Sequence, residues 1–283
     1  MKCHYVPRAY LLRFCSVRDA PMIWVFDKQE ERFLHIPVTC AAREHGFYTD
    51  DTERALAAYV EGPANPVIHK LLEKRELRSE DRLVLALYAA VMLMRVPAKR
   101  ERGRAMAPEV LDRTVREMLA EIRDHPGEAA APPGTVQGLI KELGRLHQQF
   151  LDQLPAQVIS RIESPWPTPA MVTAIASMHW RIMSSTGPSY FLTSDNPAFF
   201  FTAYGLARRE AELCLPLSTK LALLGNWQGS GPLQFVTVRQ KVVKEMNRRV
   251  ASSSTRYLFY HTAADWVRTL ALKKDHDLNR VLW

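Results

Sequence analysis

The chain has 283 residues, of which 47% are hydrophobic and 24% are charged. These values are typical of an ordinary soluble globular protein with a sizeable core. The formal net charge of +8 favours polyanionic partners, so nucleic acid is a permitted partner of the basic surface. The longest apolar stretch, residues 83–94, is too short to cross a bilayer, which excludes a membrane-spanning helix.

Cysteine usage and the N-terminal composition predict a cytoplasmic protein. The four cysteines form no CxxC pair and have no regular spacing, so we expect reduced thiols rather than disulfides. Arg8 and Arg13 interrupt any apolar segment near Met1, so nothing there resembles a secretory signal. No pattern indicates the oligomeric state.

The first elements expected along the chain are a hairpin and then a series of helices. Aromatic and β-branched residues at 23–27 and 32–36 predict two paired strands. From residue 52 to about 185 the apolar residues follow a helical period. The Ala, Pro and Gly residues at 126–134 predict a loop inside this helical part.

Several helix boundaries can be placed from single residues. Ser79 is expected to cap a helix that Pro97 kinks or ends, which leaves the basic residues 99–104 in solvent. Pro108 is expected to open the next helix. A later helix is expected to have Ile182 on its inward face.

Short strands are expected again after Gly187, with residues 225–231 as a hairpin loop. A helix at 240–252 and a strand at 256–260 follow. The order of strands, helices and strands predicts an α+β class. We expect a single domain over residues 1–283, with an antiparallel sheet formed by the N- and C-terminal segments and a large central helical insertion.

The sequence contains none of the strong motifs for metal or nucleotide binding. The nine histidines are scattered without the spacing of a metal site, and Asp275-His276-Asp277 is a weak local cluster near a polar C-terminus. The glycine-rich phosphate-binding motifs and the GxSxG nucleophile motif are also absent. We therefore predict no metal site, and no cofactor is specified.

The segment Thr193-Ser194-Asp195-Asn196-Pro197 is expected to form a turn between two strands. One interpretation is structural, because Asp and Asn side chains readily bond to the backbone in turns. The other interpretation is functional, with the Asp195 carboxylate and the Asn196 amide held at a rigid sheet edge. Both interpretations stay open at this stage.

Three further positions complete the candidate site. His4 is a candidate general acid–base, since its unperturbed pKa lies near neutrality. Arg256 precedes a strand and is expected either to bind an anion with two hydrogen bonds or to pair with a core carboxylate. We predict His4, Asp195, Asn196 and Arg256 as catalytic residues. We predict Tyr5, Arg95, Asn247 and Arg248 as substrate-binding residues.

Several of these segments together resemble a known family. They are His4-Tyr5-Val6-Pro7 with Tyr10-Leu11 and Phe14, Trp24-Val25-Phe26-Asp27, Arg95-Val96-Pro97, Thr193 to Pro197, Leu215-Pro216-Leu217-Ser218, and Asn247-Arg248. In this order they are similar to the bacterial family numbered 4238 among domains of unknown function. The resemblance runs over nearly the whole chain and implies no activity. The family's occurrence in mobile elements implies, by analogy, a toxin or phage-defence role.

These observations lead to two hypotheses. The first is a cytoplasmic hydrolase, resembling a nuclease, that acts on a phosphate-containing substrate, with nucleic acid the expected class. In it His4 is the general acid–base, Asp195 orients His4 or holds a metal, and the arginines neutralise phosphate charge. The alternative is a non-catalytic binding or scaffold protein whose motifs are structural. The first hypothesis predicts that His4, Asp195 and Arg256 converge at one rim of the sheet.

Overall fold

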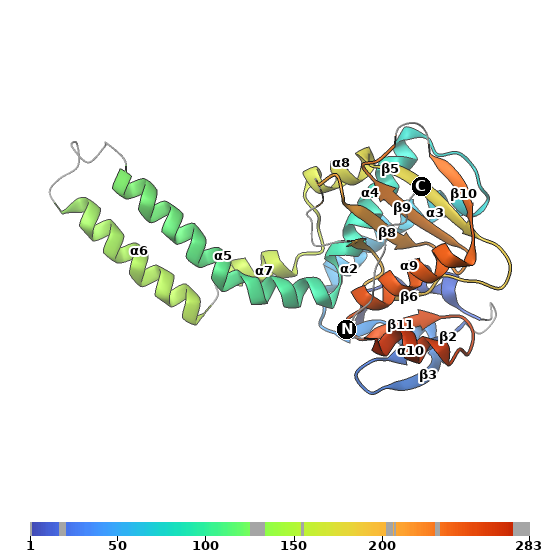
Figure 1. Ribbon diagram of the computed structural model, residues 1–283. Coiled ribbons are helices and arrows are strands. Elements are labelled where there is room, and N and C mark those ends of the chain that lie inside the picture. The colour runs from blue at the N-terminus through green and yellow to red at the C-terminus, as the bar shows by residue number, and fades with distance from the viewer. Residues whose placement is uncertain are drawn as a thin grey trace. The chain divides into compact units, whose positions relative to one another are not determined.

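The computed structural model describes residues 2–16, 21–124, 134–153, 156–201, 206, 208–229 and 233–273 (Figure 1). The chain divides into two compact units, which we describe separately. The larger unit joins Met1–Pro97 to Pro165–Trp283, and the smaller unit is Ala98–Ser164. Every strand of the described residues lies in the larger unit.

Strands from both ends of the chain share one antiparallel sheet. Its order is β3 (Arg32–Pro37), β2 (Met22–Asp27), β11 (Tyr257–Tyr260) and β6 (Thr193–Ser194). The β2–β3 hairpin matches the prediction from the sequence, and β11 pairs with β2 on its other side (Figure 1). The α+β class and the sheet built from N- and C-terminal segments are therefore confirmed.

A second sheet has five strands, of which β8 and β9 are buried on both faces. In order across the sheet they are β10 (Gln234–Val238), β5 (His179–Ser185), β9 (Leu221–Asn226), β8 (Glu212–Pro216) and β7 (Phe199–Phe201). All pairs are antiparallel except β10–β5, which is parallel. Because β5 lies between β9 and β10, the hairpin expected at 225–231 is wrong: these two strands do not pair with each other.

Helices cover the two faces of this five-stranded sheet. Trp180 and Ile182 of β5 belong to the core cluster that also contains the buried residues of α3 (Gly62–Leu72) and α4 (Ser79–Met94). Residues that point to the other face pack in a second core with α9 (Gln240–Ser253), on which α10 (Trp266–Leu272) packs. All six residues of β9 are buried, as expected for a strand between two helix layers.

The N-terminal segment is built into the fold through short elements. Strand β1 (Lys2–His4) pairs with β4 (Arg43–His45), and α1 (Arg8–Leu11) continues as the 3-10 turn η1 (Leu12–Phe14). A second 3-10 turn, η2 (Val38–Cys40), precedes β4. Tyr10, Leu11 and Phe14 are fully buried, which explains the dense aromatic pattern at this end of the sequence.

The helical stretch continues from the N-terminal segment with α2 (Asp50–Leu56), which runs into a π-helical turn, η3 (Ala57–Glu61). The Thr49 side chain caps α2 by accepting a hydrogen bond from the Thr52 amide. Helix α8 (Pro169–Ser177) completes the helices of the larger unit, and its N-cap Thr168 accepts a hydrogen bond from the Met171 amide.

The smaller unit is helical throughout its described residues. It contains α5 (Pro97–Asp124), α6 (Thr135–Asp152) and α7 (Ala156–Glu163). The prediction that the preceding helix ends at Pro97 is confirmed, because α4 ends at Met94 and Pro97 begins a new helix, α5. The prediction that Pro108 opens a helix is wrong, because Pro108 lies inside α5. The basic residues 99–104 therefore belong to a helix rather than to a solvated tail. The loop predicted at 126–134 lies, except for Gly134, outside the described residues.

Two predictions at other helix ends are also wrong. The helix after Thr168 stops at Ser177, and Ile182 lies in β5, where pairing with β9 overrides the helical period. Ser79 is the first helical residue rather than the cap; the Asp81 carboxylate accepts the Arg78 amide there instead. Among the described helices, none is long and apolar enough to cross a membrane.

Candidate functional site

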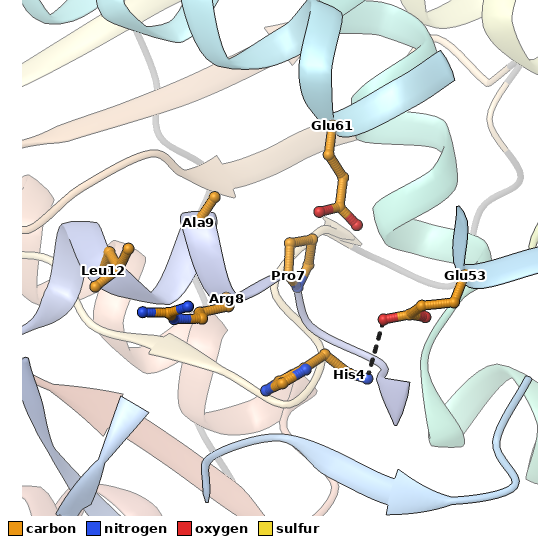
Figure 2. A pocket seen from close by; sticks show the side chains of 7 residues that line it. All are labelled: His4, Pro7, Arg8, Ala9, Leu12, Glu53 and Glu61. Carbon is orange, nitrogen blue, oxygen red and sulfur yellow. Dashed lines mark hydrogen bonds between the residues drawn. The ribbon is translucent and has the colours of Figure 1, made fainter. Parts of the chain in front are cut away.

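A polar pocket of about 390 Å³ lies where the N-terminal segment meets helix α2 and the turn η3. Figure 2 shows the side chains that line it, which are those of His4, Pro7, Arg8, Ala9, Leu12, Glu53 and Glu61. Pro7 precedes α1, so Arg8, Ala9 and Leu12 come from the first turns after it. The pocket therefore combines one imidazole, one guanidinium and two carboxylates.

His4 is held at this pocket by its backbone, while its ring keeps one nitrogen free. The backbone amide donates to Glu53 Oε1 at 3.4 Å, and the carbonyl accepts from the Arg95 guanidinium. Nε2 is buried and has no hydrogen-bond partner among the described residues. Burial lowers the pKa of His4, although a hydrogen bond with the Thr39 backbone raises it. The imidazole is therefore mainly neutral at neutral pH, and its Nε2 is buried in a residue that lines the pocket.

The two glutamates that line the pocket differ in their surroundings. Glu61 binds the buried Arg95 guanidinium, with 2.6 Å between Oε1 and Nη1. One carboxylate oxygen of Glu53, Oε1, accepts a hydrogen bond from the His4 amide. The other, Oε2, is buried and has no partner in the part of the chain that the structure describes. Burial raises the pKa of Glu53, whereas the charge of Arg95 lowers it. Figure 2 shows the Glu53 carboxylate and the His4 ring on opposite sides of the His4 backbone.

Asp195 lies in the interior, where its carboxylate binds the backbone of another segment. It is 3% exposed, and its carboxylate accepts hydrogen bonds from the amides of Thr255, Arg256 and Tyr257 at 2.9, 2.6 and 3.0 Å. Burial raises the pKa of Asp195, while these three amides lower it. Both carboxylate oxygens accept hydrogen bonds from the backbone. This geometry agrees with the structural interpretation of the 193–197 turn.

Asn196 and Arg256 have structural partners as well. The Asn196 side chain donates to the carbonyl of Ser253 at 3.0 Å, which ties the turn to the end of α9. The Arg256 guanidinium binds both oxygens of Asp27, with Nη2 to Oδ2 at 2.7 Å. Arg256 therefore pairs with a core carboxylate, which was one of the two roles expected for it.

The four residues predicted to bind substrate lie in different places and make different contacts. Tyr5 and Arg95 are buried and do not line the polar pocket; Arg95 instead clamps Glu61 to the His4 carbonyl. Asn247 accepts from the Leu192 amide and donates to the Tyr190 carbonyl, both at 2.9 Å. Asn247 and Arg248 both line a second pocket at the start of α10 and along α9.

The expected convergence of distant segments involves a neighbour of His4 rather than His4 itself. Among the described residues, the polar contacts of His4 are with Glu53, Arg95 and Thr39, and none joins it to Asp195. Tyr5, however, is buried near Asp195 and Arg256, whose charges raise and lower its pKa respectively; the largest cause of its raised pKa is burial. The N-terminal segment thus reaches the Asp195 region through Tyr5.

Comparison with known families gives one match. The model of the family described as protein of unknown function (DUF4238) matches residues 2–264 of this chain. The chain belongs to the DUF4238 family. Comparison with curated proteins and with solved structures finds no match. The DUF4238 match includes all residues of the polar pocket and every residue of the hydrogen-bonded cluster around Asp195.

Sequence reasoning missed the two pocket glutamates of this DUF4238 chain. Glu53 follows Asp50 and Asp51, and an acidic first turn is typical of a solvated helix start. The available signal was the spacing of Glu53 and Glu61, because residues eight apart lie near one face of a helix. Among the described residues, no cluster of three metal-ligating side chains exists; Asp275-His276-Asp277 lies outside them.

Proposed function

We propose that this chain is a cytoplasmic hydrolase of phosphate-containing substrates, with its reactive centre at the polar pocket of His4, Arg8, Glu53 and Glu61. The observation that carries the proposal is that two buried atoms, His4 Nε2 and Glu53 Oε2, have no partner within the described segments and belong to residues that line the same pocket. A buried polar atom without a partner requires an explanation, and a role in binding or catalysis is one such explanation. Opposite pKa shifts of two groups at one site are a common feature of acid–base catalysis.

The proposed chemistry divides the proton transfers between these two residues. His4 Nε2 takes a proton from the attacking water, whose oxygen then bonds to phosphorus. As the ester P–O bond breaks, Glu53 gives its proton to the leaving oxygen, a role that its raised pKa favours. Arg8 is exposed beside the pocket and has no ion pair among the described residues, so it can neutralise phosphate charge.

The pocket's size limits the substrate. About 390 Å³ is near the lower end of the range for small-molecule sites. A phosphate monoester or the end of a nucleic-acid strand fits such a volume, whereas the body of a duplex does not. The net charge of +8 supports attraction of polyanions to the surface, so nucleic acid stays the proposed substrate class.

A second candidate function is non-catalytic binding or scaffolding. The hydrogen-bonded positions of Asp195, Arg256 and Asn247 favour it, because three residues first assigned to chemistry or substrate bind the protein's own backbone or core carboxylate. In this alternative the His4 pocket binds a small ligand without transforming it. The two candidates differ in one measurable property, which is turnover.

The deciding experiment is a hydrolysis assay on matched variants. Wild-type protein, His4→Ala and Glu53→Gln are assayed with p-nitrophenyl phosphate, bis-p-nitrophenyl phosphate and single-stranded DNA and RNA. His45→Ala is the control, because His45 is an exposed histidine on the neighbouring strand. We expect His4→Ala to lower kcat by about 100-fold, a usual loss for a general base. His45→Ala should have wild-type activity.

The pH dependence adds a second readout. The mechanism needs a neutral His4 and a protonated Glu53, so activity should follow a bell-shaped pH profile. It falls at low pH as His4, whose pKa burial lowers, gains a proton, and it falls at higher pH as Glu53, whose pKa burial raises, loses its proton. Absence of hydrolysis by the wild-type protein, with and without added divalent ions, would leave the binding alternative. Growth of bacteria that express wild-type or His4→Ala protein, with and without phage, tests the toxin or phage-defence role implied by the family.

A further inference from the structure

We infer that the second pocket, between α9, α10 and the segment before β6, binds a small aromatic anion of the mononucleotide type. The pocket has a volume of about 660 Å³. Its lining residues are Pro188, Ser189, Tyr190, Gln240, Val243, Lys244, Asn247, Arg248, Trp266, Thr269, Leu270 and Lys273. It shares no lining residue with the polar pocket of His4, so this inference does not rest on the proposed hydrolase activity.

The walls of the pocket offer a surface for a planar ring. Tyr190 and Trp266 lie together, with ring centroids 5.8 Å apart and planes tilted by 52°. Trp266 is 45% exposed although it belongs to a core-facing helix, and Leu270 is one helical turn further along the same side. An exposed indole beside apolar side chains is the kind of surface on which nucleobases stack.

The described rim of the pocket carries positive charge. Lys244, Arg248 and Lys273 are exposed and line it, and none of the described lining residues is acidic. The exposed Arg248 donates to the buried Glu245 through Nη1 at 3.3 Å, and a guanidinium has five N–H donors, so further N–H groups can bind a ligand. Three cations around an apolar hollow favour a ligand that joins a flat apolar body to a phosphate or carboxylate group.

The frame of the pocket is rigid, which lowers the cost of binding. Asn247 is 4% exposed and fixes the segment 190–192 through its two hydrogen bonds of 2.9 Å. This clamp holds Tyr190 against α9 before any ligand arrives. A preformed site loses less conformational freedom on binding than a flexible one. Asn247 therefore acts as a positioning residue, and Arg248 beside it is placed to contact the ligand.

Calorimetric titration with AMP, adenosine and inorganic phosphate tests this inference on the full chain. Adenosine supplies the ring without the charge, and phosphate supplies the charge without the ring. We expect saturable binding of AMP, with adenosine and phosphate each bound about tenfold or more weakly. Trp266→Ala and the double variant Lys244→Gln/Arg248→Gln should each weaken AMP binding by about tenfold.

Matched controls separate the pocket from general surface effects. Lys241→Gln removes an exposed cation of the same helix that does not line the pocket, and Trp166→Ala removes an exposed indole elsewhere. Both controls should bind AMP as the wild type does, and circular dichroism should show that all variants are folded. Absence of AMP binding, equal affinity for adenosine or phosphate, or unchanged affinity in the pocket variants would overturn the inference.

Discussion

Replacement of Asp195 by Ala should destabilise the fold strongly. The carboxylate is 3% exposed and accepts three backbone hydrogen bonds, from Thr255, Arg256 and Tyr257. These residues form the entry to β11, the strand that joins the C-terminal part of the chain to β2. The side chain therefore holds a loop in the position from which the sheet is completed.

The size of the effect follows from the three amides. In Asp195→Ala all three lose their acceptor, and water has little access to a site of this burial. An unsatisfied buried donor costs about 1–3 kcal/mol. Partial relaxation of the loop lets some donors find new acceptors, so we expect a loss of about 3–5 kcal/mol in the free energy of unfolding. Asp195→Asn keeps one carbonyl acceptor but turns an amide group toward the donors, and should lose about half as much.

Urea unfolding followed by tryptophan fluorescence measures this loss. The expected result is a lower midpoint with an unchanged m-value, which means lost stability rather than a changed unfolded state. Asp51→Ala is the control, since Asp51 is exposed and its ion pair with Arg54, at 3.4 Å, lies at the surface. A variant Asp195→Ala that is as stable as the wild type but inactive in hydrolysis would refute the structural role and restore Asp195 to the reactive centre.

Two further predictions concern buried polar groups of the same sheet region. Tyr10→Phe removes a hydroxyl that lies 2.7 Å from both Thr193 Oγ1 and the Pro216 carbonyl oxygen. We expect this change to lower the free energy of unfolding by about 1–2 kcal/mol, measured by the same urea assay. An unchanged urea midpoint would contradict this prediction. Although burial raises the pKa of Asp27, hydrogen bonds from Arg256 and two amides bring it below its ordinary value of 3.8. Because the pKa of Asp27 is lower in the folded state than in the unfolded state, its charge stabilises the fold above about pH 4, and this stabilisation is lost as the pH falls through the folded-state pKa. Arg256→Gln should therefore reduce the loss of stability between about pH 6 and pH 3, measured as the shift of the urea midpoint.

Much of the fold could be predicted from the sequence because local patterns and tertiary structure agree there. The β2–β3 hairpin, helix α9 and strand β11 follow from alternating or helical apolar periods that the final packing uses unchanged. Predictions failed where long-range pairing overrides the local pattern. Ile182 fits a helical period but lies in β5, whose partners β9 and β10 are about 40 or more residues away.

The candidate site was harder to predict, because the same type of polar residue can be catalytic, bind a ligand or form structural hydrogen bonds. Asp195 and Arg256 were identified as partners in one region, and they do lie together, but as a backbone clamp and an ion pair with Asp27. Glu53 resembles an ordinary helix-start residue until the His4 amide and the pocket are known. Whether a polar side chain has a catalytic or a structural role depends on its neighbours in space, and these neighbours are often far away in the sequence.

The sheet shared by the two ends of the chain has a consequence for how the protein is made. Arg256 and its partner Asp27 are 229 residues apart in sequence. At synthesis rates of roughly 5–20 residues per second, about 10–50 s pass between the synthesis of β2 and that of β11. During this interval the β2–β3 hairpin has an unpaired edge, and an isolated hairpin is only marginally stable.

An unpaired, apolar strand edge attracts other chains and chaperones. The aromatic edge formed by Trp24 and Phe26 stays open until Tyr260 and Leu258 pair with it. Completion of this sheet therefore has to follow the synthesis of β11, and yield in the cell depends on how long the nascent N-terminal hairpin is protected. Slow folding of this kind is typical of sheets closed by contacts between distant parts of a chain.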